Sequence, residues 1–251
     1  FASHKELKLV VMCRDARKYA DFLRKEFLTY KAYSKLSSNS FQVHWLDVDY
    51  ISDTAIGRDD HADTGTPAIV HSAPGFLIEQ KKRMAKRTTL KQVPHPDVKA
   101  AQLDAYAALI VDLFQYMIGN TDYSLVTSGS DDDCCHNTKL MSHEDSAGFL
   151  PVPYDFDNAG LVDASYAQPT HLVPVQRVTQ RYYRGFCLHL TEMDAATAKF
   201  TQHREEIIQL FRDDKLLSPR AVRRSVKYLN EFFDLITDED RRKRAIRNRC
   251  R

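Results

Sequence analysis

The sequence lacks any apolar run near the length of a membrane span. About 20 consecutive apolar residues are needed to cross a bilayer, and no run in these 251 residues approaches that length. We therefore expect no transmembrane segment. A large excess of either charge is also absent, since the formal net charge is +2. Bulk charge thus gives no reason to expect nucleic acid as a partner.

A secretory signal peptide is also missing. The chain begins at Phe1 rather than at methionine, so we expect that upstream residues are not included, and the missing signal says nothing about the compartment. The five cysteines form no CxxC pair, which argues against a zinc site built from cysteine alone. The adjacent Cys134 and Cys135 either pair with distant cysteines in an oxidising compartment or remain reduced. The sequence leaves both possibilities open.

What the sequence does contain is 43% apolar and 28% charged residues, which is typical of a globular protein. Its length suffices for one substantial core or two small ones. Residues 7–13, "LKLVVMC", predict a buried strand, and a helix is expected over 15–36 because its aromatic residues recur on one face. Glu26 lies on that apolar face. Periodicity alone favours a hydrated Glu26 at the edge of the stripe, since buried glutamate is rare.

The middle of the chain alternates strands, loops and one short helix. We expect a strand at 40–51 with a bulge after Trp45, a loop at 52–73, a short strand at 76–79 that leads into a basic helix, and a proline-containing connection at 88–96.

The second half is mainly helical. Asp97 is expected to cap a helix that runs to Ile118, with Gly119 ending it. "NTKLM" and "LPVPYDF" predict a hairpin. Further helices are expected at about 194–213, from a Ser218 cap to about 236, and after Asp238, where a basic segment is most simply a solvated helix.

Acidic and amide residues follow several of these elements in a suggestive order. Asp122 follows the helix end in "YMIGNTDYSL", Asn137 precedes the hairpin, and Asp155 ends it. A polar loop, a hairpin and an aspartate after it form the phosphoryl-transfer site of protein kinases. Hard oxygen ligands are needed there because they hold Mg²⁺ beside the phosphates. Alone, Asp122 could be a turn residue, but the ordered set of three is more specific.

Other residues near these positions have simpler interpretations. His136 is a candidate base, but a histidine beside a strand more often packs or forms a hydrogen bond. "DFDNAG" lacks the DxDxDG pattern of a calcium loop.

These motifs resemble a known family. "FQYMIGNTD", "HNTKL" and "VPVPYDFD" are similar to the active-site core of atypical kinases of the HipA and CotH type, within the protein-kinase-like superfamily. The match extends over nearly all of the chain. It includes the features "LKLV", "FLIE", "CCHN" and "YRGFC" of a bacterial group of such proteins.

The resemblance implies an α+β, bilobal fold with a small β-rich N-lobe at 1–87, which is expected to be truncated here. A linker at 88–96 and a larger helical C-lobe at 97–251 would follow. By the same resemblance, Asp122 matches the catalytic-loop aspartate, while Asn137 and Asp155 match the metal ligands.

The resemblance also implies a nucleotide site. Glu26 matches the helix glutamate that pairs with a phosphate-binding lysine, which reverses the interpretation from periodicity. Ile78 and Glu79, in "FLIEQ", fall where a hinge would contact adenine. Lys8 is the candidate lysine in this chain, although the CotH-like lysine falls on a strand that would precede Phe1. The expected cofactors are ATP and Mg²⁺.

Two departures from the family pattern matter. Asp122 and Asn137 are 15 residues apart, whereas the kinase motif separates them by about five. The intervening "LVTSGSDDDC" must therefore loop out. Asp157 also stands where a glycine usually follows the metal-binding aspartate.

We therefore predict an atypical kinase that transfers a phosphoryl group from Mg-ATP to a protein hydroxyl. The alternatives are a pseudokinase or envelope binding module without catalysis, and an AMPylation-type nucleotidyl transfer on the same fold. The resembling proteins usually carry an export signal. This implies the cell envelope or periplasm, or export, with a cytoplasmic location as the alternative.

Overall fold

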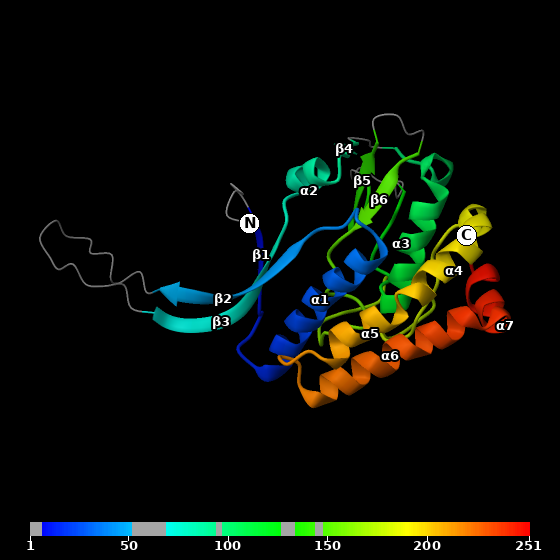
Figure 1. The fold of residues 1–251 in the computed structure, drawn as a ribbon. Helices are drawn as coiled ribbons and strands as arrows, with labels where there is room; N and C mark the ends of the chain where they lie inside the picture. The colour runs from blue at the N-terminus through cyan, green and yellow to red at the C-terminus, as the bar shows by residue number, and fades with distance from the viewer. Residues whose placement is uncertain (1–6, 52–68, 94–96, 127–133, 144–147) are drawn as a thin grey trace, which may run out of the picture.

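The structure, a computed structural model, describes residues 7–51, 69–93, 97–126, 134–143 and 148–251. It mixes helices with two three-stranded antiparallel sheets, in agreement with the expected α+β class. Figure 1 shows one long hairpin extending on one side of the molecule, while the C-terminal helices gather on the other. No helix of the described residues is long and apolar enough to span a membrane.

The first sheet has the antiparallel strand order β1-β3-β2. The helix expected over 15–36 is present and packs on this sheet, because its aromatic residues recur at helical spacing and are buried. Phe27 makes edge contacts with Trp45 and Phe76, with ring centroids 5.4 and 5.8 Å apart. The elements are β1 (Lys8–Val11), α1 (Arg17–Leu36), β2 (Val43–Ile51) and β3 (Ile69–Ile78).

Two expectations about this sheet are wrong. The register shift of β2 falls between Tyr50 and Ile51 rather than after Trp45. Residues 69–73 belong to β3 instead of a loop. The pairing with β2 makes this stretch a strand, and pairing between strands is invisible to a local hydrophobic pattern. The rest of the expected loop, 52–68, lies outside the described residues.

The second sheet contains the predicted hairpin. β5 (Thr138–Ser142) and β6 (Leu150–Pro153) pair antiparallel, with Thr138 opposite Pro153. The expected connection at 88–96 contains a two-residue strand, β4 (Lys91–Gln92), that pairs with β5. The basic helix before it is α2 (Lys81–Arg87).

Helix α3 (Ala105–Ile118) is shorter than expected. Its cap is Asp104, whose Oδ1 accepts a 2.8 Å hydrogen bond from the Ala107 amide, and Asp97 does not cap it. The 3-10 turn η2 (Ala100–Gln102) lies between these two aspartates in the sequence. Both aspartates are plausible caps by type, and tertiary packing selects the second. Gly119 ends the helix in the left-handed conformation, with φ 68°, as predicted.

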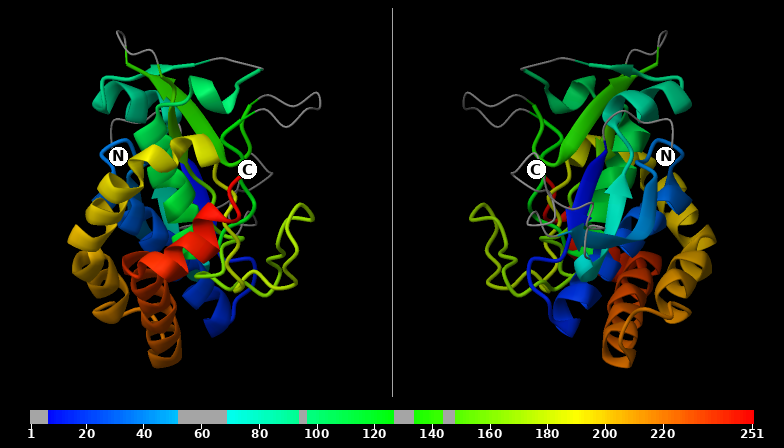
Figure 2. Two further views of the ribbon diagram at one scale, coloured as in Figure 1. Left: turned by 90° about the vertical axis from the view of Figure 1, so that its right-hand side faces the viewer. Right: turned by 90° about the vertical axis from the view of Figure 1, so that its left-hand side faces the viewer.

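The chain after β6 first runs without regular structure and then forms the C-terminal helices. Figure 2 shows the irregular stretch in yellow-green. The helix predicted at 194–213 is interrupted at His203, whereas the Ser218 cap is confirmed, since its hydroxyl accepts from the Ala221 amide. The elements are η3 (Cys187–Glu192), α4 (Met193–Gln202), α5 (Arg204–Arg212), α6 (Pro219–Thr237), α7 (Glu239–Arg242) and the π-helical η4 (Lys243–Arg247).

Candidate functional site

The open end of the β5–β6 hairpin brings two of the predicted residues together. The register places Asn137 beside Tyr154, whose amide donates a 3.1 Å hydrogen bond to the Asn137 carbonyl. Asp155 is the next residue. Both Asn137 and Asp155 have left-handed backbone, with φ 50° and 63°. Asparagine and aspartate adopt this conformation more readily than other residues with a side chain.

Asp122 reaches the same place from the end of α3. The Asn137 amide Nδ2 lies 2.8 Å from the main-chain oxygen of Asp122 and 3.3 Å from its Oδ2. The insertion between the two residues therefore does not keep them apart. Residues 127–133 of that insertion lie outside the described part of the chain. The Asp122 amide donates to Oδ1 of Asn120 at 2.8 Å, which fixes the turn that presents the carboxylate.

Lys8 and Glu26 approach Asp155 from the other side. The Lys8 Nζ, half-exposed on β1, lies 3.7 Å from Oδ2 of Asp155. Glu26 is only 5% exposed on α1, so the buried interpretation is correct and the hydrated one is wrong. Burial raises the pKa of Glu26 to about 8, and the carboxylates of Asp157 and Asp155 add to this while the Lys8 ammonium opposes it. Much of the Glu26 population is therefore protonated near neutral pH.

A pocket of about 280 Å³ lies between these groups. Lys8, Glu26 and Asp155 line it together with Asp157 and Tyr166, and the remaining wall is mostly apolar. Burial, helped by the charge of Asp155, raises the pKa of Asp157. Several carboxyl groups thus face one small space where they disfavour one another's ionisation. A cation bound there would relieve that repulsion.

A second pocket, of about 380 Å³, lies next to it and shares Lys8. Ile78 and Glu79 line it, as do Lys139 and the ring of Tyr154. The Lys139 ammonium lies 4.6 Å from the centroid of that ring. The pocket combines an aromatic face, apolar wall and ammonium groups, a combination suited to a flat, anionic ligand.

The Glu79 carboxylate is not available to such a ligand. Arg87 donates to both of its oxygens, at 3.0 and 2.8 Å, and the Gln42 amide donates to Oε2 at 3.1 Å. The Glu79 amide is likewise bonded to the Gln42 carbonyl, at 2.9 Å. A contact between Glu79 and a ligand would therefore involve its main-chain carbonyl.

Sequence reasoning missed three contributors to the site. His136 was expected to pack or to form a hydrogen bond, without a partner in the site, and its Nε2 lies 2.8 Å from Oδ1 of Asp122. The Asn158 amide lies 3.3 Å from Oδ2 of Asp122 and from Oδ1 of Asp157, and so bridges the two. The Tyr30 hydroxyl accepts a 2.9 Å hydrogen bond from the Asp155 amide. Tyr30 follows Glu26 by one helical turn, and that spacing was the available signal.

The residues present fit a magnesium ion, although they do not form a complete coordination shell. Among the described residues, no three His, Cys, Asp or Glu side chains are grouped to hold a metal. Mg²⁺ commonly takes one or two protein ligands and completes its shell with phosphate oxygens and water. The partly exposed Asp155 carboxylate and Oδ1 of Asn137, whose Nδ2 is bonded to Asp122, provide ligands of that kind.

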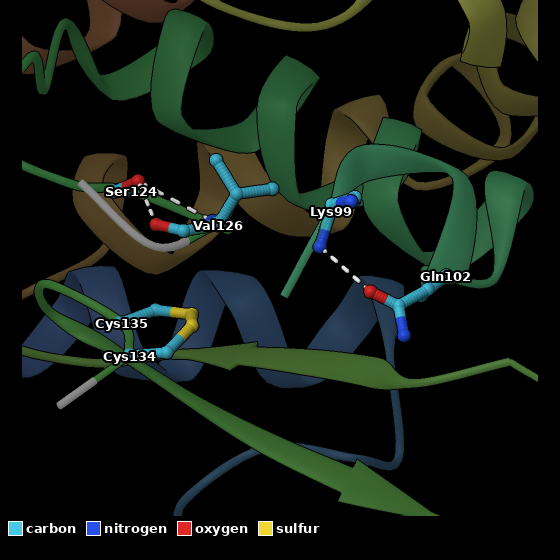
Figure 3. The surroundings of a disulfide bond; sticks show 6 residues. All are labelled: Lys99, Gln102, Ser124, Val126, Cys134 and Cys135. Carbon is cyan, nitrogen blue, oxygen red and sulfur yellow. Dashed lines mark hydrogen bonds between the residues drawn. A yellow bond between two sulfur atoms is a disulfide. The ribbon is translucent and has the colours of Figure 1, made fainter. Parts of the chain in front are cut away.

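The described residues contain two disulfides, one before Asp155 in the sequence and one after it. Cys134 pairs with Cys135, immediately before His136 and Asn137, and Cys187 pairs with Cys250. Figure 3 shows the first pair beside the Ser124–Val126 turn, where the Ser124 hydroxyl donates to the Val126 carbonyl. Cys134 and Cys135 thus pair with each other and not with distant partners. Cys13 is exposed and outside any disulfide.

Comparison with known proteins finds no family model, no curated protein and no solved structure that matches this chain. The function is therefore argued from the residues of the site.

Proposed function

We propose that this chain is a kinase-like phosphotransferase that uses Mg-ATP to phosphorylate a protein hydroxyl. The observation that carries the proposal is the gathering of Lys8, Glu26, Asp122, Asn137 and Asp155 at one hairpin end from segments far apart in sequence. Each is of a residue type that phosphoryl transfer uses, and the five occur along the chain in the order in which protein kinases place these roles.

The arrangement of elements supports a bilobal, kinase-like fold for this chemistry. A strand with Lys8 precedes a helix with Glu26, and two strands then lead into the Ile78–Glu79 segment. The polar turn and the hairpin follow in the second half. We propose the lobe boundaries 1–87 and 97–251 on this basis.

The roles follow from the geometry. Lys8 would contact the phosphates, with Glu26 behind it, and the second pocket would hold the base against Tyr154. Asp122, fixed by Asn120, Asn137 and Asn158, would orient the acceptor hydroxyl. Asn137 and Asp155 would hold Mg²⁺, which, when bound, neutralises charge on the β- and γ-phosphates. Most of the catalytic effect would come from positioning and electrostatic stabilisation.

A nucleotide-binding pseudokinase is the second candidate. Asp157 in place of glycine favours it, because this carboxylate narrows the pocket and brings another negative charge toward the phosphates. The Cys187–Cys250 disulfide supports an oxidising compartment such as the cell envelope for either candidate.

Labelled nucleotide distinguishes these functions. With γ-labelled ATP and Mg²⁺, the wild-type chain is expected to transfer or release label, whereas Asp122→Asn loses roughly 100-fold or more in kcat. Label transferred from α-labelled ATP to protein would indicate AMPylation instead. Binding of Mg-ATP without release or transfer of either label would establish the pseudokinase.

A further inference from the structure

Arg184 contacts the main chain on both sides of Asp122. Its side chain is buried in the irregular segment after β6, and the residue is 8% exposed. One nitrogen, Nη1, donates to the carbonyl of Thr121 and, at 2.7 Å, to the carbonyl of Tyr123. These two residues flank Asp122. The guanidinium therefore holds the peptide groups that set the direction of the Asp122 side chain.

A second contact fixes the same turn from α3. The Tyr123 hydroxyl donates a 2.9 Å hydrogen bond to Oδ1 of Asp112, a buried carboxyl group. The Arg184 guanidinium also lies 5.5 Å from the centroid of the Tyr123 ring. Arg184 and Asp112 thus hold Thr121 and Tyr123. The Asp122 carboxylate between them points to a different set of residues, His136, Asn137 and Asn158.

The segment that carries Arg184 is itself anchored. The Cys187 amide donates to the Arg251 carbonyl at 2.9 Å. The Arg251 amide returns a 3.0 Å hydrogen bond to Gly185, and the disulfide joins Cys187 to Cys250. Arg184 thus extends from a fixed main chain toward the turn, as a positioning group requires.

We propose that Arg184 is the positioning residue that aims the Asp122 carboxylate at the acceptor hydroxyl. The inference rests on the proposed function for its catalytic meaning, but the fixing of the turn is testable without catalysis. Arg184 does not contact the reacting atoms, so its loss is expected to lower kcat and to leave nucleotide affinity nearly unchanged.

Arg181 provides a matched control. It is also a largely buried arginine that donates to main-chain carbonyls, those of Met117 and Tyr228, neither of which flanks Asp122. Its replacement should cost comparable stability without disturbing Asp122. Arg184→Lys is the conservative variant, since an ammonium also carries several N–H donors on one nitrogen.

The experiment compares Arg184→Ala, Arg184→Lys and Arg181→Ala with the wild type. Three quantities are measured: kcat and KM for release of label from γ-labelled Mg-ATP, the melting temperature, and amide hydrogen exchange of residues 121–126. We expect Arg184→Ala to lower kcat about 100-fold, with KM for ATP within about threefold, and to speed exchange in 121–126. Arg181→Ala should lower the melting temperature to a similar extent but keep kcat and the exchange pattern, and Arg184→Lys should recover part of kcat.

Equal loss of kcat in Arg184→Ala and Arg181→Ala, or unchanged exchange in 121–126, would overturn the inference. If Arg184→Ala does not fold, the comparison of Arg184→Lys with Arg181→Ala decides in the same way. A wild-type chain that binds no Mg-ATP and releases no label would instead overturn the proposed function. The exchange data would then still show whether Arg184 fixes the turn.

Discussion

At the scale of single residues, the candidate site gathers acidic groups that are costly to bury. Burial raises the pKa values of Glu26 and Asp157, and the charge of Asp155 raises both further. Such clusters occur where a ligand or cation compensates the charge. That Asp122 and Asn137 meet at the end of the hairpin that carries Asp155 could be predicted from the sequence, because the order of the three along the chain is distinctive. The contact of His136 with Asp122 was not predicted, because packing or another hydrogen bond was the simpler expectation. Asn158 could not be predicted, since nothing local distinguishes it from an ordinary polar loop residue.

Asp112 provides a residue-scale prediction about pH. Burial raises its pKa to about 7, from an ordinary 3.8. Between these values the folded state retains a proton that the unfolded state has released, so stability falls as pH rises through this window. Between pH 5 and 8 the wild type should lose about 2–3 kcal/mol of unfolding free energy that Asp112→Asn does not lose.

Urea unfolding at several pH values measures this difference. Parallel stability curves for the wild type and Asp112→Asn would contradict the assignment of this pH dependence to Asp112.

At the scale of elements, helix α1 connects the first sheet to the site. Its apolar face packs on β2 and β3, while Tyr30 binds the Asp155 amide and the Lys25 ammonium donates to the Val162 carbonyl. The helix and the β5–β6 hairpin were predictable because their periodicity is strong. The start of β3 and the break at His203 were not, because strand pairing and helix packing decide them rather than local sequence.

The two disulfides give an element-scale prediction. Cys187–Cys250 joins residues 63 positions apart, and a cross-link of that span stabilises the folded state by roughly 4 kcal/mol in the chain-entropy model. Replacing both residues by serine should therefore lower the urea midpoint clearly. The pair Cys134–Cys135 joins neighbours and encloses almost no loop, so its replacement should change the midpoint little. Equal losses in the two double variants would refute this explanation.

At the scale of the whole molecule, the order of elements carries most of the functional argument. Lys8, Glu26, the Ile78–Glu79 segment and Asp155 follow one another along the chain and line two adjoining pockets. Asp122 is linked to the first pocket through Asn158 and Asp157. The order of these residues could be read from the sequence alone. The contact of the Asn137 amide with the main-chain oxygen of Asp122 across the insertion could not. That contact depends on the register of the hairpin, which places Asn137 beside Tyr154.

The central claim is that Asp155 holds Mg²⁺ for a nucleotide in this site. Its most direct test is the change in melting temperature that Mg-ATP causes in the wild type, Asp155→Asn and Asp163→Asn. Both aspartates have positive φ, 63° and 53°, and asparagine tolerates this conformation, so backbone strain is matched. At about 100 times Kd, binding contributes roughly 2.7 kcal/mol, equivalent to about 5–10 °C for a chain of this size.

We expect that shift in the wild type and in Asp163→Asn, only with Mg²⁺ present, and little or none of it in Asp155→Asn. A full shift in Asp155→Asn, or no shift in the wild type, would contradict the claim.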